Sequence, residues 1–179
     1  MVAESNPKVV EELVPQMLST GEVVKVLREL LKEQISVRDM RSILETLADH
    51  AGDTRDVGVL TECVRGSLSR AITRRYSDEN GVLHVLTLGQ GAEMAFRRGT
   101  TPDGRSALDP SVANALLSNL ERSFAELSME DTLPVLLTPP DLRRQLRTFT
   151  ERFIPNLTVL SYREVDASAE IRALGAVNV

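Results

Sequence analysis

The fold class is decided by residues 133–160, which read LPVLLTPPDLRRQLRTFTERFIPNLTVL. The apolar run Leu133–Leu137 predicts a short strand, and the two prolines after Thr138 favour a helix start, because proline is tolerated in a first helical turn. A second apolar run, Leu157–Leu160, predicts another strand. The intervening helix places apolar residues at helical spacing: Leu142, Leu146, Phe149 and Phe153. Strand, helix and strand at this spacing predict a right-handed βαβ unit in a parallel sheet.

More strands and a helix are expected on either side of this unit. Asp78–Gly81 is a turn signal, and the apolar run Val82–Leu88 behind it predicts a strand. Residues 99–107 are rich in Gly, Thr and polar side chains, which indicates a loop. Asp109 followed by proline then predicts a helix whose apolar stripe is Leu116, Leu120, Phe124 and Leu127. Ile171–Val177 is the candidate for a last strand.

The N-terminal part of the sequence has the capping residues and apolar spacing of short helices. Ser19 and Glu22 have capping-box spacing, and Ser36 is the expected cap of a second helix, with Asp39 three residues later. The buried stripe predicted for the first helix is Val23, Val26, Leu27, Leu30 and Leu31. The stripe predicted for the second is Met40, Ile43, Leu44 and Leu47. Together they predict a helix, a turn and a helix.

One longer helix is predicted over 54–75, with Val57, Leu60, Val64, Leu68 and Ile72 turned inward. The break before it places a domain boundary near Asp53. The expected fold is therefore α+β, with a small helix-turn-helix-like subdomain over residues 1–53. An α/β subdomain with a βαβ unit and a short sheet follows over residues 54–179.

Composition favours a folded protein with an aliphatic core. Of the 179 residues 42% are hydrophobic, aromatic residues make up 3%, and tryptophan is absent. The net charge of −5 opposes general binding to phosphate backbones, and few aromatic side chains are present for stacking on bases. No apolar run approaches the roughly 20 residues that span a bilayer, and the start lacks signal-peptide features. We expect a soluble chain that does not bind nucleic acid.

Catalytic, cofactor and metal sites are not indicated. The segment Leu88-Gly89-Gln90-Gly91 is the nearest approach to a phosphate-binding loop, but it lacks the lysine that such loops carry. His50 and His84 lie far apart, without ligands at metal-binding spacing. Cys63 with His84 is conceivable as a nucleophile and base, but nothing local supports it. A small α/β enzyme is the more distant alternative.

Two groups of charged residues are candidates for a protein interface. Arg143, Arg144 and Arg147 lie off the apolar stripe of their predicted helix, and arginine forms planar bidentate pairs with carboxylates. This face could dock an acidic partner or be an ordinary solvated surface. Arg38 and Arg41 lie on the predicted second helix, which invites comparison with DNA-reading helices. Acidic residues share that helix and would repel phosphates: Asp39, Glu45 and Asp49. A DNA-binding regulator stays an alternative.

Longer stretches are more specific than any of these patterns. They include NPKVVEELVP at 6–15, ISVRDMRSILETLAD at 35–49 and IPNLTVLSY at 154–162. These stretches resemble the FlhA family of flagellar export-gate proteins and its injectisome relatives. The resemblance covers nearly the whole chain and departs from the family pattern mainly between Leu88 and Asp109. Softer cues, including the Ala176-Val177-Asn178 end, favour the flagellar branch.

The resemblance implies a role in protein transport by type III secretion or flagellum biogenesis, not catalysis. Such gates span the bacterial inner membrane with their N-terminal half, and their four cytosolic subdomains form a nonameric ring. This chain resembles the last two subdomains, at the cytoplasmic face of that membrane. The implied partners are further copies of the subunit, export substrates with chaperones, and the stalk of the export ATPase. No chaperone-binding residue is carried over, and the isolated chain is expected to be monomeric.

The resemblance also gives the second helix an assembly role. Its polar residues Arg38, Asp39, Arg41 and Glu45 are candidates for reciprocal pairs across a ring interface. The alternative is that the same residues make helix caps and i, i+4 contacts within one chain.

Overall fold

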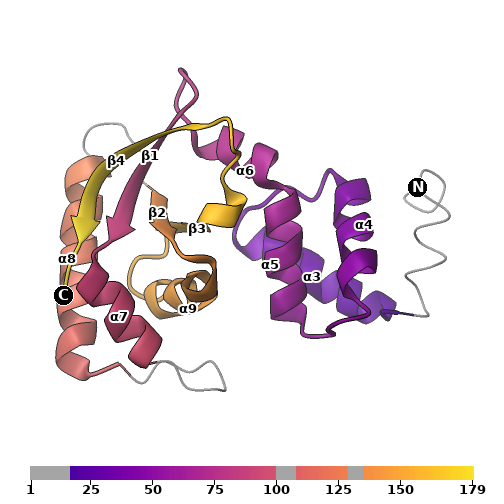
Figure 1. Cartoon of the computed structure of the whole chain (residues 1–179), viewed down its shortest axis with the longest axis horizontal. Helices are drawn as coiled ribbons and strands as arrows, with labels where there is room; N and C mark the ends of the chain where they lie inside the picture. The colour runs from indigo at the N-terminus through magenta and orange to yellow at the C-terminus, as the bar shows by residue number, and fades with distance from the viewer. Residues whose placement is uncertain (1–16, 100–107, 129–134) are drawn as a thin grey trace. The chain divides into compact units, whose positions relative to one another are not determined.

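The chain folds as two compact units, with the boundary in the sequence between Ile72 and Thr73. Figure 1 labels the helices and strands of both units. The computed structural model describes residues 17–99, 108–128 and 135–179. Helices and a parallel sheet together confirm the predicted α+β class. The quoted stretch 6–15, the predicted loop from residue 100 onward, and Leu133 and Pro134 of the predicted strand lie outside the described residues.

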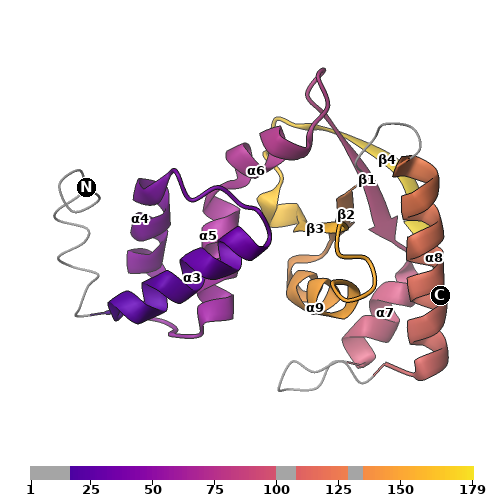
Figure 2. The same cartoon turned by 180° about the vertical axis from the view of Figure 1, so that it is seen from behind.

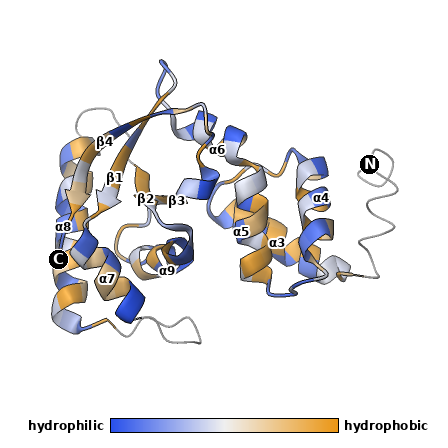
Figure 3. Ribbon diagram, viewed as in Figure 1, coloured by the Kyte–Doolittle hydropathy of each residue, from blue (hydrophilic) through white to orange (hydrophobic). Residues whose placement is uncertain are grey.

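Within its described residues, the first unit contains three complete helices, α3 (Thr20–Lys32), α4 (Met40–His50) and α5 (Val57–Ser67). Helix α5 packs against both α3 and α4. Hydrophobic segments, drawn in orange, are visible along both α3 and α5 in Figure 3. Buried aliphatic residues from all three helices form the core: Val26, Leu30, Ile43, Leu44, Leu47, Leu60 and Val64. Burial of such side chains contributes most of the stability of short helices in proteins.

Of the two predicted helix caps, the one at Ser19 is confirmed and the one at Ser36 is wrong. Ser19 and Glu22 form the predicted capping box, with the Glu22 amide donating to Ser19 Oγ at 3.2 Å. Helix α4 begins later than predicted, because Asp39 and not Ser36 caps it. Ser36 Oγ instead accepts the amide of Arg38 at 3.3 Å, which shapes the turn before the helix.

The buried stripe of α3 is narrower than predicted. Val23, Val26 and Leu30 are buried, but Leu31 is 54% exposed and Leu27 is half-buried. Among the described residues α5 makes the main packing contact with α3, and Leu31 lies outside the buried side of α3.

The long helix predicted over 54–75 is interrupted at Leu68. Helix α6 (Ser69–Tyr76) follows α5 after this one residue, whose amide is shared between the carbonyls of Val64 and Arg65. Such tightened bonding is typical of a helix end. The sequence placed the domain boundary near Asp53. In the structure α5 packs against α3 and α4, and the first compact unit extends to Ile72.

The second unit is organised around a parallel sheet in the order β3-β2-β1-β4. Its strands are β1 (Val82–Leu88), β2 (Val135–Thr138), β3 (Thr158–Ser161) and β4 (Glu170–Val177). All pairings between these strands are parallel, and β1 pairs with β4 from Val82 to Leu88, with a register shift between Val85 and Leu86. The strands predicted over 82–88, 157–160 and 171–177 are therefore confirmed.

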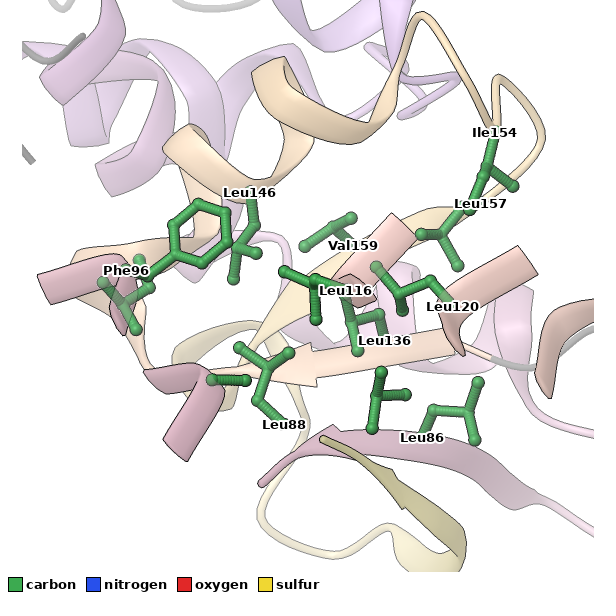
Figure 4. Packing of buried hydrophobic residues seen from close by; sticks show 13 residues of the cluster. Leu86, Leu88, Phe96, Leu116, Leu120, Leu136, Leu146, Ile154, Leu157 and Val159 are labelled. Atoms are coloured by element: carbon green, nitrogen blue, oxygen red, sulfur yellow. The ribbon is translucent and has the colours of Figure 1, made fainter. Parts of the chain in front are cut away.

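Three helices cover one face of this sheet: α7 (Gln90–Arg98), α8 (Pro110–Ser128) and α9 (Pro140–Thr150) (Figure 2). Helix α9 links β2 to β3, which confirms the predicted βαβ unit. A continuous cluster joins strands and helices, including Leu86, Leu88, Phe96, Leu116, Leu120, Leu136, Leu146 and Val159 (Figure 4). Phe153 does not join it: α9 ends at Thr150, and Phe153 is 57% exposed.

A short 3-10 helix, η1 (Tyr162–Glu164), follows β3 and leads toward β4. Among the described residues, no helix is both long enough and apolar enough to cross a membrane.

Candidate protein interface

Polar residues around the start of α4 form a surface that we call the α4 surface: the exposed Arg38, Asp39 and Arg41, and the partly buried Glu45. Asp39 is the helix cap, with Oδ1 accepting the amide of Ser42 at 3.1 Å and Oδ2 accepting the Ser42 hydroxyl at 2.8 Å. The Asp39 side chain is thereby held by its own helix.

Arg41 and Glu45 pair along the helix. Arg41 Nε donates to Glu45 Oε1 at 2.8 Å, and the two side chains are 72% and 44% exposed. The hydrogen bond to Glu45 raises the pKa of the Arg41 guanidinium. Such exposed i, i+4 pairs contribute little to stability. The α4 surface is thus organised within one chain and open to solvent, and its role in assembly stays a prediction.

Arg143 is buried, and the prediction that it lies on a solvated face is wrong. Its side chain is 2% exposed, and Nε lies 4.0 Å from Oε2 of Glu164, which is 1% exposed. Arg143 Nη1 also lies 3.5 Å from the carbonyl oxygen of Val159. The reason is the position of η1, which brings an acidic side chain against α9 at a point that the helical pattern alone does not indicate. Arg143 therefore ties α9 to β3 and η1.

Arg147 and Arg144 also differ from each other in burial. Arg147 is half-buried, and its Nη1 donates to the carbonyl oxygen of Leu157 at 2.9 Å and lies 3.4 Å from that of Pro155. It satisfies backbone acceptors in the loop between α9 and β3. Arg144 is exposed. The three predicted arginines therefore do not form one docking surface.

Glu164 is the residue that the sequence analysis missed. Its Oε2 accepts the amide of Ser161 at 2.6 Å, completing a capping box around η1. Its carbonyl oxygen lies 3.3 Å from the hydroxyl of Thr73, which also accepts the amide of Asp166 at 2.8 Å. The signal in the sequence is the spacing of Ser161 and Glu164, which matches the capping-box pattern.

The sequence candidates for phosphate binding, metal binding or nucleophilic catalysis do not form a site among the described residues. A Cβ added at Gly89 would collide with the side chain of Asn178 and lie 3.3 Å from the carbonyl oxygen of Val177, so close packing on β4 accounts for this glycine. His84 Nε2 lies 2.9 Å from Oδ2 of Asp78 in the preceding turn. Cys63 is half-buried on α5 in the first unit, whereas His84 belongs to the second. The described residues bring no three metal-ligating side chains together.

Comparison with known proteins places this geometry in a family. The profile of the FHIPEP family matches residues 1–170. The flagellar biosynthesis protein FlhA of Bacillus subtilis (strain 168) is 36% identical over 179 residues, which cover 98% of this chain and 26% of that protein. The chain thus spans about a quarter of the length of the curated relatives it matches.

Solved structures agree with this assignment in both units. The Chlamydia pneumoniae CdsV protein has a TM-score of 0.90 at 30% identity, covering 99% of this chain and 52% of that one. In a complex with CdsO the same protein has a TM-score of 0.88 at 30% identity, covering 98% and 51%. Nonameric EPEC SctV-C has a TM-score of 0.85 at 30% identity, covering 99% and 54%. Since profile, sequence and structure agree over most of its length, the chain belongs to the FHIPEP family.

Proposed function

We propose that the chain is the C-terminal cytosolic portion of a flagellar protein-export gate subunit. It acts in ring assembly and in docking export substrates, chaperones and the ATPase stalk at the cytoplasmic face of the bacterial inner membrane. The observation that carries the proposal is the similarity to nonameric EPEC SctV-C, which extends over 99% of the chain and so includes both units.

Docking is the second part of the proposal. The solved complex of CdsV with CdsO supports it, because that relative binds another protein and resembles this chain over 98% of its length. The 36% identity to a flagellar relative over 98% of the chain supports the flagellar branch. In this role the chain is a binding and assembly module and not an enzyme.

We propose that the α4 surface contributes to assembly. Its Asp39 and its Arg41–Glu45 pair are held in place by the helix itself, so the surface is preorganised and exposed before any partner arrives. Preorganised charges at an interface favour specificity and orientation more than affinity.

The test is an Arg41→Glu substitution in the full-length parent protein. Because the Arg41 side chain is 72% exposed, the variant should fold, while a reversed charge should weaken subunit contacts. We expect loss of ring-sized particles in sedimentation of the detergent-solubilised protein, and reduced motility and substrate secretion in cells. Arg98→Glu, an exposed arginine on α7, is the matched control and should leave all three unchanged.

A charge swap separates assembly from helix stability. The double variant Arg41→Glu, Glu45→Arg restores an ion pair within α4 but presents the wrong charges to a neighbour. If Arg41 acts between subunits, the swap remains defective. Full rescue by the swap would show that the pair acts only within its helix. Normal rings and secretion in Arg41→Glu would remove the α4 surface from the proposal.

A further inference from the structure

Helix α3 carries a second apolar stripe, on a side that is partly exposed to solvent. Val24 is 37% exposed, Leu31 is 54% exposed, and Leu27 between them is half-buried. With about 100° of rotation per residue, these three side chains lie within an arc of roughly 60° on one face of the helix. We call them the α3 stripe. Figure 2 shows α3 in front of α5, with which it packs.

The α3 stripe is additional to the face that holds the unit together. Val23, Val26 and Leu30 are buried and fill the inner side of α3. Single exposed apolar residues are ordinary on protein surfaces. Three at i, i+3 and i+7 form a continuous ridge, which is the pattern by which helices pack against other helices.

A row of cations runs along one side of the stripe. Lys25, Arg28 and Lys32 are all exposed and repeat at the same i, i+3, i+7 spacing, each one position after a member of the stripe. Lys32 Nζ lies 2.5 Å from Glu29 Oε1. Lys25 and Arg28 make no ion pair within the described parts of the chain. By the same helical geometry the acidic residues Glu22, Glu29 and Glu33 lie beyond this row, away from the stripe.

We infer that the outer side of α3 docks an amphipathic helix of a partner protein, with Asp and Glu beside its apolar residues. The ridge calls for a partner with apolar side chains at helical spacing, and the cations select acidic flanks. Helix α3 has 13 residues, a length of roughly 20 Å, which suits a partner segment of a few turns. The inference rests on the docking part of the proposed function, and it does not require ring formation.

The experiment uses two fluorescein-labelled helical peptides and the 179-residue chain. Both peptides carry leucines at i, i+3, i+7; one has Glu and the other Lys at the flanking positions. Fluorescence anisotropy should show binding of the Glu peptide, about tenfold or more tighter than the Lys peptide, and weakened by salt. Val24→Ser with Leu31→Ser should weaken binding by about tenfold or more, since it removes the apolar anchors.

Two further variants control for charge and for general hydrophobicity. Lys25→Glu with Arg28→Glu should reverse the preference toward the Lys peptide. Val59→Ser, which replaces another valine that is 45% exposed in the same unit, should leave binding unchanged. Thermal melts of all variants should match the parent chain, because each replaced side chain is at least partly exposed.

Several results would overturn the inference. They are no binding of either peptide at low salt, equal binding of both, or equal loss in Val59→Ser. Concentration-dependent oligomers that Val24→Ser with Leu31→Ser abolishes would show that a second copy of the chain occupies the stripe, which also overturns it. The same double variant in the full-length parent should leave ring assembly intact, so failure of this inference and failure of the proposed assembly role are separate observations.

Discussion

Arg143 of α9 and Glu164 of η1 are both buried and lie with Nε and Oε2 4.0 Å apart. A buried cation and a buried carboxylate each lose much of their hydration, and they compensate one another only while both are present. We therefore expect Glu164→Gln to destabilise the chain by about 3–5 kcal/mol, since the buried Arg143 then loses the charge of a buried carboxylate beside it. Urea denaturation followed by circular dichroism measures this change.

The double variant Arg143→Met, Glu164→Gln is the control for that prediction. It removes both charges, while the amide oxygen can still accept the Ser161 N–H that Glu164 accepts now. It should recover most of the lost stability, because apolar replacement of a buried pair is often close to neutral. If Glu164→Gln alone unfolds at the same urea concentration as the parent chain, the pair has no structural role.

Arg147 and Arg144 both lie on α9, but we expect their replacement by alanine to have different effects on stability. Arg147→Ala removes a donor to the carbonyl oxygen of Leu157, and we expect a loss of about 1.5–3 kcal/mol, as for other hydrogen bonds to charged groups. Arg144→Ala alters an exposed side chain and should change stability by about 0.5 kcal/mol or less. Thermal denaturation of the two variants side by side makes the comparison. Equal effects would contradict the structural role assigned to Arg147.

Gly89 and Gly91 allow a second comparison, between two glycine-to-alanine substitutions. A methyl group at Gly89 would meet the Asn178 side chain and the carbonyl oxygen of Val177, so Gly89→Ala should cost about 1 kcal/mol even if Asn178 moves aside. At Gly91, inside α7, the nearest atom would be Val179 Cγ2 at 3.5 Å, an ordinary contact. Gly91→Ala should therefore stabilise the chain by about 0.5–1 kcal/mol. Chemical denaturation distinguishes the two, and a stabilising Gly89→Ala would refute the packing argument.

Acid stability should depend on Asp78. The hydrogen bond with His84, followed by the one from the Val82 amide, holds the pKa of the Asp78 carboxyl below its ordinary value. A carboxyl with a lowered pKa in the folded state contributes stability above its unfolded pKa, near 4, and that contribution disappears as the pH falls through the folded value. Asp78→Asn should therefore lower stability at neutral pH and flatten the decline below about pH 4. Melting temperatures from pH 7 to pH 2 test this, and parallel pH profiles for the two proteins would refute it.

The sequence predicted those elements whose signals are local. Ser19 with Glu22 marked a helix start, and the two apolar runs around α9 marked a βαβ unit, because capping and periodicity act over a few residues. The break at Leu68 was missed, since a one-residue tightening of a helix end leaves the apolar spacing almost unchanged. Leu31 was wrongly placed in the core because periodicity indicates which residues share a face but not how wide the covering neighbour is.

The candidate site was less predictable than the fold. Arg38, Asp39, Arg41 and Glu45 are where a helical surface should place them, but nothing local distinguishes an intrahelical pair from one between subunits. Arg143 was misjudged because its burial depends on Glu164, which reaches α9 only through the turn after β3. Contacts of this kind arise from the tertiary fold and have no periodic signature.

The pairing of β1 with β4 has a consequence for biosynthesis. Thr87 and Gly175, which meet across these strands, are 88 residues apart in the chain. While a ribosome is still making the segment between them, β1 has no partner along the side that β4 later occupies. Strand edges left open in this way attract other extended chains. The second unit can therefore complete its sheet only after β4 has been synthesised.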